Sequence, residues 1–214
     1  MKEKVFYHFS KAFWVFIIGS IFGYCIEMIV AFVQEGHFES RQGLLYGPFA
    51  QVYGLGALAY YFTVPHIKGK KKYLKVFLFS MVMGGIVEYL CSFIQEKWFG
   101  TISWDYSNLW FNINGRTSLL HCTYWGLAGL LFIKWVYPFI GKLDNWMKNL
   151  NFRFATVVLT LFMIFNITIS SMAAYRQKER VKNIAAQNQI DLFFDIYYPD
   201  DVMNKIYANK IHIL

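Results

Sequence analysis

The run AFWVFIIGSIFGYCIEMIVAFV, residues 12–33, decides the fold. A transmembrane helix takes about 20 predominantly apolar residues, and this run has that length with Glu27 as its only charged residue. Four more stretches have the same character: residues 46–64, 74–94, 117–140 and 154–174. The sequence therefore predicts an all-α integral membrane protein with five transmembrane helices.

The composition of the whole chain agrees with a membrane protein. Of its 214 residues, 57% are hydrophobic and only 16% are charged, whereas soluble domains carry about 25% charged residues. This excludes soluble, disordered and disulfide-scaffold proteins. The net charge of +8 comes from residues that flank the apolar runs, so we expect the lipid bilayer as a partner and no nucleic acid.

Basic residues predict the orientation, because Lys and Arg are retained on the cytoplasmic side. They gather before the first run, between the second and third, and between the fourth and fifth. We therefore expect a multi-pass protein of the cell membrane with a cytoplasmic N-terminus. Five spans then place the amphipathic helical tail, residues 176–214, outside. Arg176, Lys178, Arg180 and Lys182 follow the last span directly, so either the tail lies outside despite these basic residues or one span is miscounted.

The chain also contains an internal repeat. A shift of 61 residues aligns residues 23–38 with residues 84–99, with identities at Gly23/Gly84, Glu27/Glu88, Phe32/Phe93, Gln34/Gln95, Glu35/Glu96 and Phe38/Phe99. Beyond a longer loop in the second copy, Arg41 corresponds to Arg116. This predicts a membrane domain over residues 1–175, built from two pseudo-symmetric two-helix hairpins (12–64 and 74–140) and a fifth span.

The two repeated glutamates lie inside predicted spans, where a carboxylate is costly and usually faces a bundle interior. We expect each to pair with an arginine, Glu27 with Arg41 and Glu88 with Arg116, or in the crossed arrangement. Two interpretations stay open. The pairs are either structural locks between the hairpins, or they flank a path for a substrate or a proton.

The loop before the fourth span carries a further set of polar residues. Asp105 is expected to accept hydrogen bonds from hydroxyl or backbone donors, and Gly115 to allow the turn that presents Arg116. The complete motif consists of Trp104, Asp105, Tyr106, Ser107, Asn112 and Gly115. His121 is either a hydrogen-bonded structural residue or a proton-transfer group.

Several chemistries are not expected. The cysteines lack metal-site spacing, so we predict no metal and no cofactor. The sequence has no Gly-rich ATP-binding loop and no recognisable nucleophile motif, so we predict that the chain is not an enzyme and does not hydrolyse ATP itself.

Together, Glu27, Arg41, Gly47-Pro48 and the WDYS…N-x-x-GR motif (residues 104–116) resemble the ABC-transporter type IV (CmpB-like) permease family, from the N-terminus to about residue 140. The resemblance implies a small bacterial protein that is the membrane part of an exporter or importer. As a transport component, a permease without its own ATPase, the chain is expected to form a homodimer. A separate ATPase subunit would dock on Lys68–Lys75 or on the segment around Asp144–Lys148. The alternative function is a non-transport membrane protein, either an assembly or sensing factor or an intramembrane enzyme that uses His121 with Glu88.

Overall fold

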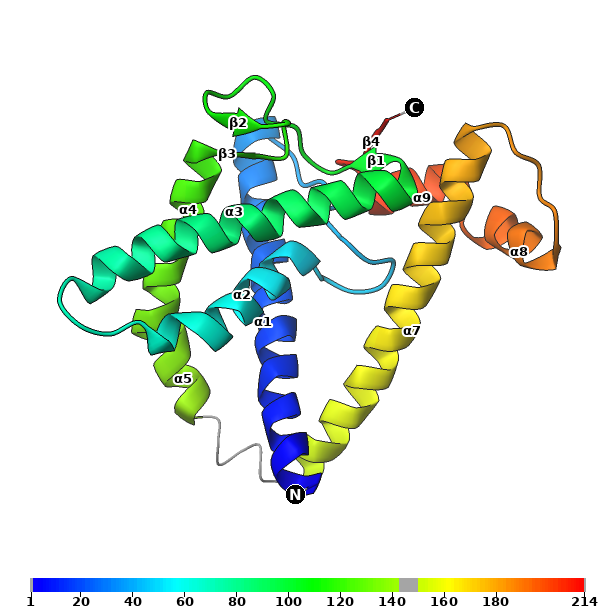
Figure 1. Ribbon diagram of the computed structural model, residues 1–214. Coiled ribbons are helices and arrows are strands. Elements are labelled where there is room, and N and C mark those ends of the chain that lie inside the picture. The colour runs from blue at the N-terminus through cyan, green and yellow to red at the C-terminus, as the bar shows by residue number, and fades with distance from the viewer. Residues whose placement is uncertain (1, 143–149, 214) are drawn as a thin grey trace.

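Four apolar helices organise the protein, whose computed structural model describes residues 2–142 and 150–213 (Figure 1). In these residues, the segments long and apolar enough to cross a membrane are Glu3–Glu35, Lys72–Phe99, Leu119–Lys142 and Phe152–Val181. They belong to α1 (Lys2–Glu35), α3 (Lys72–Phe99), the α4–η2–α5 unit and α7 (Leu150–Val181). The α4–η2–α5 unit consists of α4 (Leu119–Leu131), the π-helical turn η2 (Phe132–Val136) and α5 (Tyr137–Lys142). The prediction of an all-helical, multi-pass membrane protein is confirmed.

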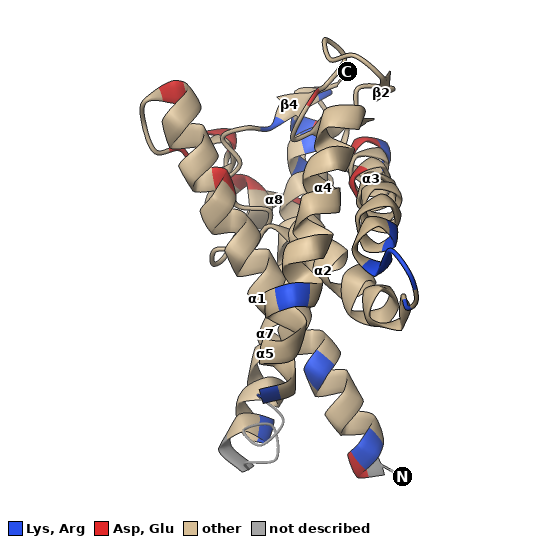
Figure 2. Cartoon of the chain, turned by 90° about the vertical axis from the view of Figure 1, so that its left-hand side faces the viewer, with Lys and Arg blue, Asp and Glu red and all other residues tan. Residues whose placement is uncertain are grey.

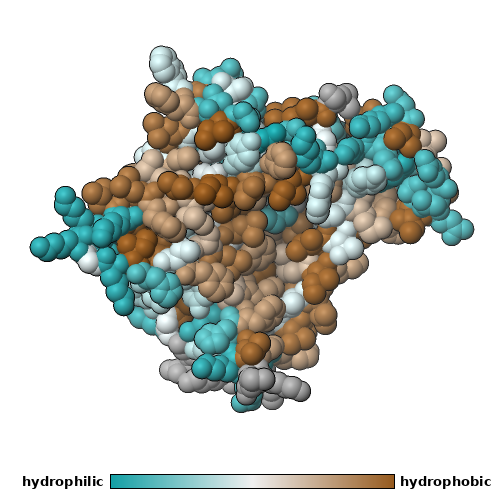
Figure 3. Space-filling view, in the orientation of Figure 1, coloured by the Kyte–Doolittle hydropathy of each residue, from teal (hydrophilic) through white to brown (hydrophobic). Residues whose placement is uncertain are grey.

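The long helices expose apolar side chains on their outer faces. Phe22 on α1 is 66% exposed, and Val82 on α3 and Leu161 on α7 are similarly open. Figure 3 shows apolar residues along α3 and α7, with hydrophilic residues gathered at the ends of the molecule. Such a surface matches a surrounding of lipid acyl chains, in which exposed apolar side chains carry no cost.

The second predicted span differs from the other four. Its helix α2 (Gln51–Thr63) has 13 residues and is followed by the 3-10 turn η1 (Val64–His66). Residues 46–50, expected to be helical, form no helix, and Gly47 has φ +81°. At about 1.5 Å per residue, α2 alone is too short to cross a bilayer. A fifth crossing therefore remains a prediction.

The helices pack as two pairs, α1 against α2 and α3 against α4. The loop after α3 forms β1 (Thr101–Ile102) and then a small hairpin of β2 (Asn112–Ile113) and β3 (Thr117–Ser118). Basic residues lie at the N-terminal end of α1, at the α2–α3 turn and on α5 (Figure 2).

The tail begins as a continuation of α7 through Val181 and then forms α8 (Gln189–Tyr197), α9 (Asp200–Ile206) and β4 (Ile211–His212). Strand β4 pairs antiparallel with β1, and Tyr207 forms a β-bridge with Arg41. The tail thus contacts the loops that follow both α1 and α3, and it lies at the end of the molecule away from the N-terminus (Figure 1).

Candidate functional site

Uncharged hydrogen-bond donors surround the carboxylates of Glu27 and Glu88. Glu88 on α3 is only 6% exposed. Its Oε2 accepts from Thr117 Oγ1 at 2.7 Å and its Oε1 from the Tyr106 hydroxyl at 3.2 Å, with the Trp125 side chain as a further donor. Glu27 on α1 accepts a hydrogen bond from the Tyr53 hydroxyl. Neither carboxylate forms an ion pair with any residue that the structure describes.

The two glutamates come from different helix pairs, which meet through aromatic rings. The ring of Tyr53 on α2 lies 5.5 Å from that of Trp125 on α4, centroid to centroid. A glycine supports each ring: a Cβ added to Gly23 would overlap Tyr53, and one added to Gly84 would overlap Trp125. The absence of both Cβ atoms lets α1 approach α2, and α3 approach α4, closely enough for the bonds to the carboxylates.

The predicted Glu–Arg pairs are wrong in their partners. Arg41 pairs with Glu35 at 2.7 Å and with Glu39 at 3.1 Å, and Arg116 pairs with Glu96 at 2.5 Å. The physical reason is distance along the helix. Glu35 and Glu96 each lie eight residues beyond the predicted glutamate, about 12 Å further along at 1.5 Å per residue, and so at the helix ends that the arginines reach.

Aromatic rings also hold Arg116. Its guanidinium carbon lies 5.6 Å from the Tyr89 ring centroid and 5.5 Å from that of Phe93. The Arg116 side chain is 13% exposed and that of Arg41 is 14% exposed. These two arginines tie the loops after α1 and α3 to the ends of those helices, so each ion pair locks a loop within its own hairpin and not, as expected, one hairpin to the other.

The motif in the loop between α3 and α4 builds a compact turn that carries Tyr106. As predicted, Asp105 accepts from the Ser107 backbone N–H at 2.9 Å and from the Ser107 hydroxyl at 3.1 Å. Gly115 has φ +68°, a conformation that favours glycine, and its carbonyl accepts from the Tyr106 N–H at 2.8 Å. The motif therefore positions the Tyr106 hydroxyl against Glu88.

The remaining motif residues close the turn. Trp104 Nε1 donates to the Arg116 carbonyl at 2.8 Å, and Asn112 accepts from the Gly115 N–H at 3.0 Å.

Burial raises the pKa of Tyr106 above its usual range, and the nearby Glu88 charge raises it further. Tyr106 therefore stays protonated and remains a hydrogen-bond donor.

His121 adjoins this site through Tyr106. The two rings are stacked with centroids 3.6 Å apart, and His121 Nδ1 lies 2.8 Å from the Ser118 hydroxyl. These contacts give His121 a structural role beside the carboxylates. A role in proton transfer is not tested by them.

Polar residues of α7 hold the irregular segment before α2, a feature that the sequence analysis missed. Asn166 accepts from the Tyr46 N–H at 3.2 Å and donates to the Tyr46 carbonyl at 2.7 Å. Ser170 accepts from the Leu45 N–H at 2.9 Å, and the Ala50 N–H donates to the Ser20 carbonyl of α1. The available signal was Asn166 itself, an amide in the middle of an apolar run.

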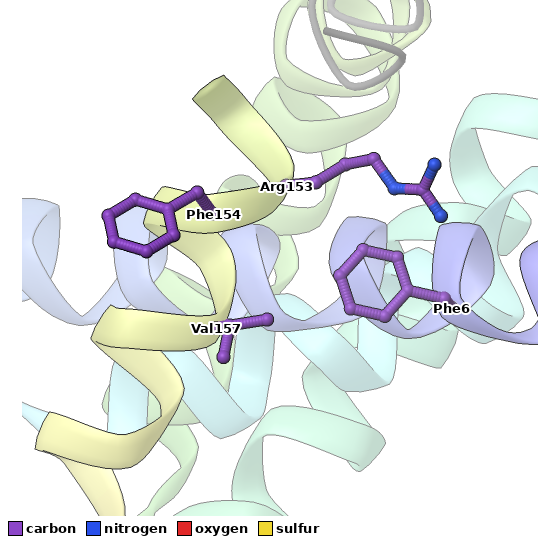
Figure 4. A pocket seen from close by; sticks show the side chains of 4 residues that line it. All are labelled: Phe6, Arg153, Phe154 and Val157. Atoms are coloured by element: carbon purple, nitrogen blue, oxygen red, sulfur yellow. The ribbon is translucent and has the colours of Figure 1, made fainter. Parts of the chain in front are cut away.

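Two other features of the described residues lie apart from these carboxylates. Ligand atoms of Glu35, His37 and Glu39 lie within 4.8 Å of one another, but Arg41 already pairs with both carboxylates. A shallow depression lies where α1 and α7 begin, lined by Phe6, Arg153, Phe154 and Val157 (Figure 4). It carries no carboxylate and involves none of the residues around Glu27 and Glu88.

Comparison with known proteins identifies the family. A sequence model of the family described as "Putative ABC-transporter type IV" matches residues 14–171. No curated protein and no solved structure matches the chain.

Proposed function

Because this chain belongs to the ABC-transporter type IV family, we propose that it is the membrane-embedded permease component of a transport system and relies on a separate subunit for ATP hydrolysis. In this proposal the chain is not itself an enzyme. Glu27 and Glu88, with the tyrosines and Thr117 that bond them, flank the passage between the two helix pairs.

One observation carries the role of the two glutamates. A carboxylate that serves only as a lock in a membrane is best paired with a cation, because an unpaired charge is costly there. Arg41 and Arg116, the arginines expected beside them, bond other glutamates at the ends of the helices. Glu27 and Glu88 thus accept hydrogen bonds from uncharged groups, and a substrate or a proton can replace these bonds without separating an ion pair. This favours the interpretation that the two residues flank a path for a substrate or a proton.

Equivalent contacts in the two helix pairs support the proposed repeat. Gly23 meets Tyr53 as Gly84 meets Trp125. A Cβ on Gly54 would meet Phe16, and one on Gly126 would meet Phe77, which lies 61 residues after Phe16. The Arg41–Glu35 and Arg116–Glu96 ion pairs correspond as well. In transporters, such repeats surround the substrate site.

The second crossing of the proposed five is discontinuous: the irregular segment, residues 42–50, followed by α2 and η1. Non-helical backbone is tolerated at membrane depth where protein buries it and satisfies its polar groups. Side chains of α7 and the carbonyl of Ser20 do so here. Broken helices of this kind line binding sites in several transporter folds.

The basic residues support a cytoplasmic N-terminus in the cell membrane. On that side the exposed lysines of Lys68–Lys75 offer a docking surface for an ATPase subunit. The other predicted docking segment, around Asp144–Lys148, lies outside the described residues. A second copy of the chain would supply the second half of a dimeric permease.

Purification of the full chain from its native membrane in mild detergent tests the proposal. We expect mass spectrometry to find a co-purifying subunit with an ATP-binding motif. Recovery of this chain alone, together with function independent of ATP, would contradict the permease role and favour an assembly or sensing factor.

The purified complex in liposomes then tests the site. Glu88→Gln and Glu27→Gln should reduce ATP hydrolysis to the level of the isolated ATPase subunit while protein abundance stays normal. Glu96→Gln is the matched control, since Glu96 lies on the same helix as Glu88 but forms the ion pair with Arg116. This variant should lower the thermal stability and leave the rate of ATP hydrolysis at that of the native complex. The same ATPase level in all three variants would contradict a special role for the pair. A His121→Ala variant measures whether the stacked imidazole takes part in proton transfer.

A further inference from the structure

Helix α8 carries an apolar face that no other part of the described chain covers. Its inner face packs Phe194, 4% exposed, against Leu45, Ala173 and Met203. On the opposite face Ile196 is 69% exposed, and the residues beside it at helical spacing are also open. This exposed face consists of Ile190, Phe193, Ile196 and Tyr197.

Both charged side chains of α8, Asp191 and Asp195, are already hydrogen-bonded within the protein. Asp195 accepts from Arg176 Nη2 at 2.8 Å and from Arg180 Nη1 at 2.8 Å. Asp191 accepts from the Gln187 N–H, and Asn188 caps the helix by accepting from the Ile190 and Asp191 N–H groups. The exposed face therefore carries no charged group, and the hydroxyl of its Tyr197 belongs to a side chain that prefers the membrane interface.

The ion pairs fix the depth of α8. A charged network is costly inside hydrocarbon and stable where the membrane meets water. Arg176, Arg180 and Asp195 form such a network at the end of α7, the last apolar helix. Because Asp195 belongs to α8, the helix lies beside the upper part of α7 (Figure 1). The cost of burying the network in hydrocarbon puts this level at the boundary between membrane and water.

We propose that α8 lies in the headgroup region of a neutral phospholipid bilayer, with its exposed apolar face against the acyl chains. Helix α7, against whose Ala173 the inner face of α8 packs, exposes apolar side chains such as Leu161 to the lipid. The sequence of α8, QIDLFFDIY, contains two Asp and no Lys or Arg, so apolar burial and not attraction to anionic headgroups holds it there. The inference does not depend on the transport function.

Spin labelling of the full chain in phosphatidylcholine bilayers tests this placement. The label is attached at Ile196→Cys in a background without Cys25, Cys91 and Cys122, and thermal unfolding is compared with that of the native chain. Collision rates with oxygen, which partitions into lipid, and with a water-soluble nickel complex report the surroundings of the label. Gln187→Cys, an exposed polar position in the loop before α8, is the matched control.

We expect the Ile196 label to collide more with oxygen and the Gln187 label more with the nickel complex. Added salt or anionic lipid should leave the Ile196 result unchanged. Nickel access equal to that at Gln187 would overturn the proposal, as would lipid contact that requires anionic lipid. Spin–spin broadening at Ile196 that disappears on dilution with unlabelled protein would also overturn it, because a second copy would then cover the face.

Discussion

The Tyr53 hydroxyl donates a hydrogen bond to the Glu27 carboxylate across the contact between α2 and α1. The bond depends on how closely the two helices approach, since the Tyr53 ring occupies the space that a side chain at Gly23 would take. In the other helix pair, the close approach of α3 and α4 likewise depends on Gly84, because the Trp125 ring occupies the space that a side chain at Gly84 would take.

Alanine at Gly84 should therefore destabilise the protein. The added Cβ would overlap the Trp125 ring and force α3 from α4, at a cost of about 1–3 kcal/mol. Thermal unfolding in detergent measures it. Gly141→Ala is the control, because nothing lies within 4 Å of a Cβ at that helical position. Equal stability of the two variants would contradict the packing described.

Removal of one partner of the Arg116–Glu96 pair should cost about 1–3 kcal/mol, because the other charge is left largely buried without a partner. A double-mutant cycle with Arg116→Gln and Glu96→Gln isolates the coupling between them. The Arg153–Glu3 pair, at 3.5 Å and with Glu3 87% exposed, is the control and should give a coupling of about 0–1 kcal/mol. Similar couplings for both pairs would argue against the lock.

Asn166→Leu should destabilise the irregular segment before α2. It leaves the Tyr46 N–H and carbonyl without their partner, and each buried unsatisfied group costs about 1–3 kcal/mol. Hydrogen–deuterium exchange should rise at residues 44–50. Thr168→Val, which removes an exposed hydroxyl bonded within α7, should leave the exchange unchanged. No rise for Asn166→Leu would mean that α7 does not hold this segment.

The docked tail should become more stable in alkaline solution. Burial lowers the pKa of Lys210 to about 8 from its ordinary 10.5. Between these pH values the folded chain binds fewer protons than the unfolded chain, so stability rises with pH there. Exchange at residues 200–213, corrected for its intrinsic pH dependence, measures the rise. Lys210→Met should abolish the rise and Lys205→Met, an exposed lysine in α9, should retain it; a rise in both variants would exclude Lys210 as its source.

Hydropathy predicts most of the helices, because four of the five long apolar runs coincide with long helical segments. It fails before α2, where residues 46–50 are as apolar as a span but form no helix. An apolar run does not reveal whether its backbone hydrogen bonds are made internally or, as at Tyr46, with another helix. The glycine and proline at Gly47-Pro48 were the local signal for the break.

At the site, sequence reasoning found the two glutamates and the motif loop and missed the partners. The repeat also matches Glu35 with Glu96, yet the cost of a charge deep in a span favours Glu27 and Glu88 as the partners of the arginines. Which carboxylate an arginine reaches depends on the conformation of the loop that carries the arginine. The pairing of β4 with β1, which ties the tail to the loop after α3, involves two residues on each strand and is too short to leave a pattern in the sequence.

Asn166 and Ser170 also constrain how the protein is made. The stretch around Leu45 and Tyr46 emerges from the ribosome long before the residues that complete its hydrogen bonds, 120 positions apart in the case of Asn166. The first hairpin consequently remains unfinished throughout synthesis of the second, and it matures only when the last apolar helix enters the bilayer. A chain that stops before residue 166 would leave this backbone open to quality-control proteases.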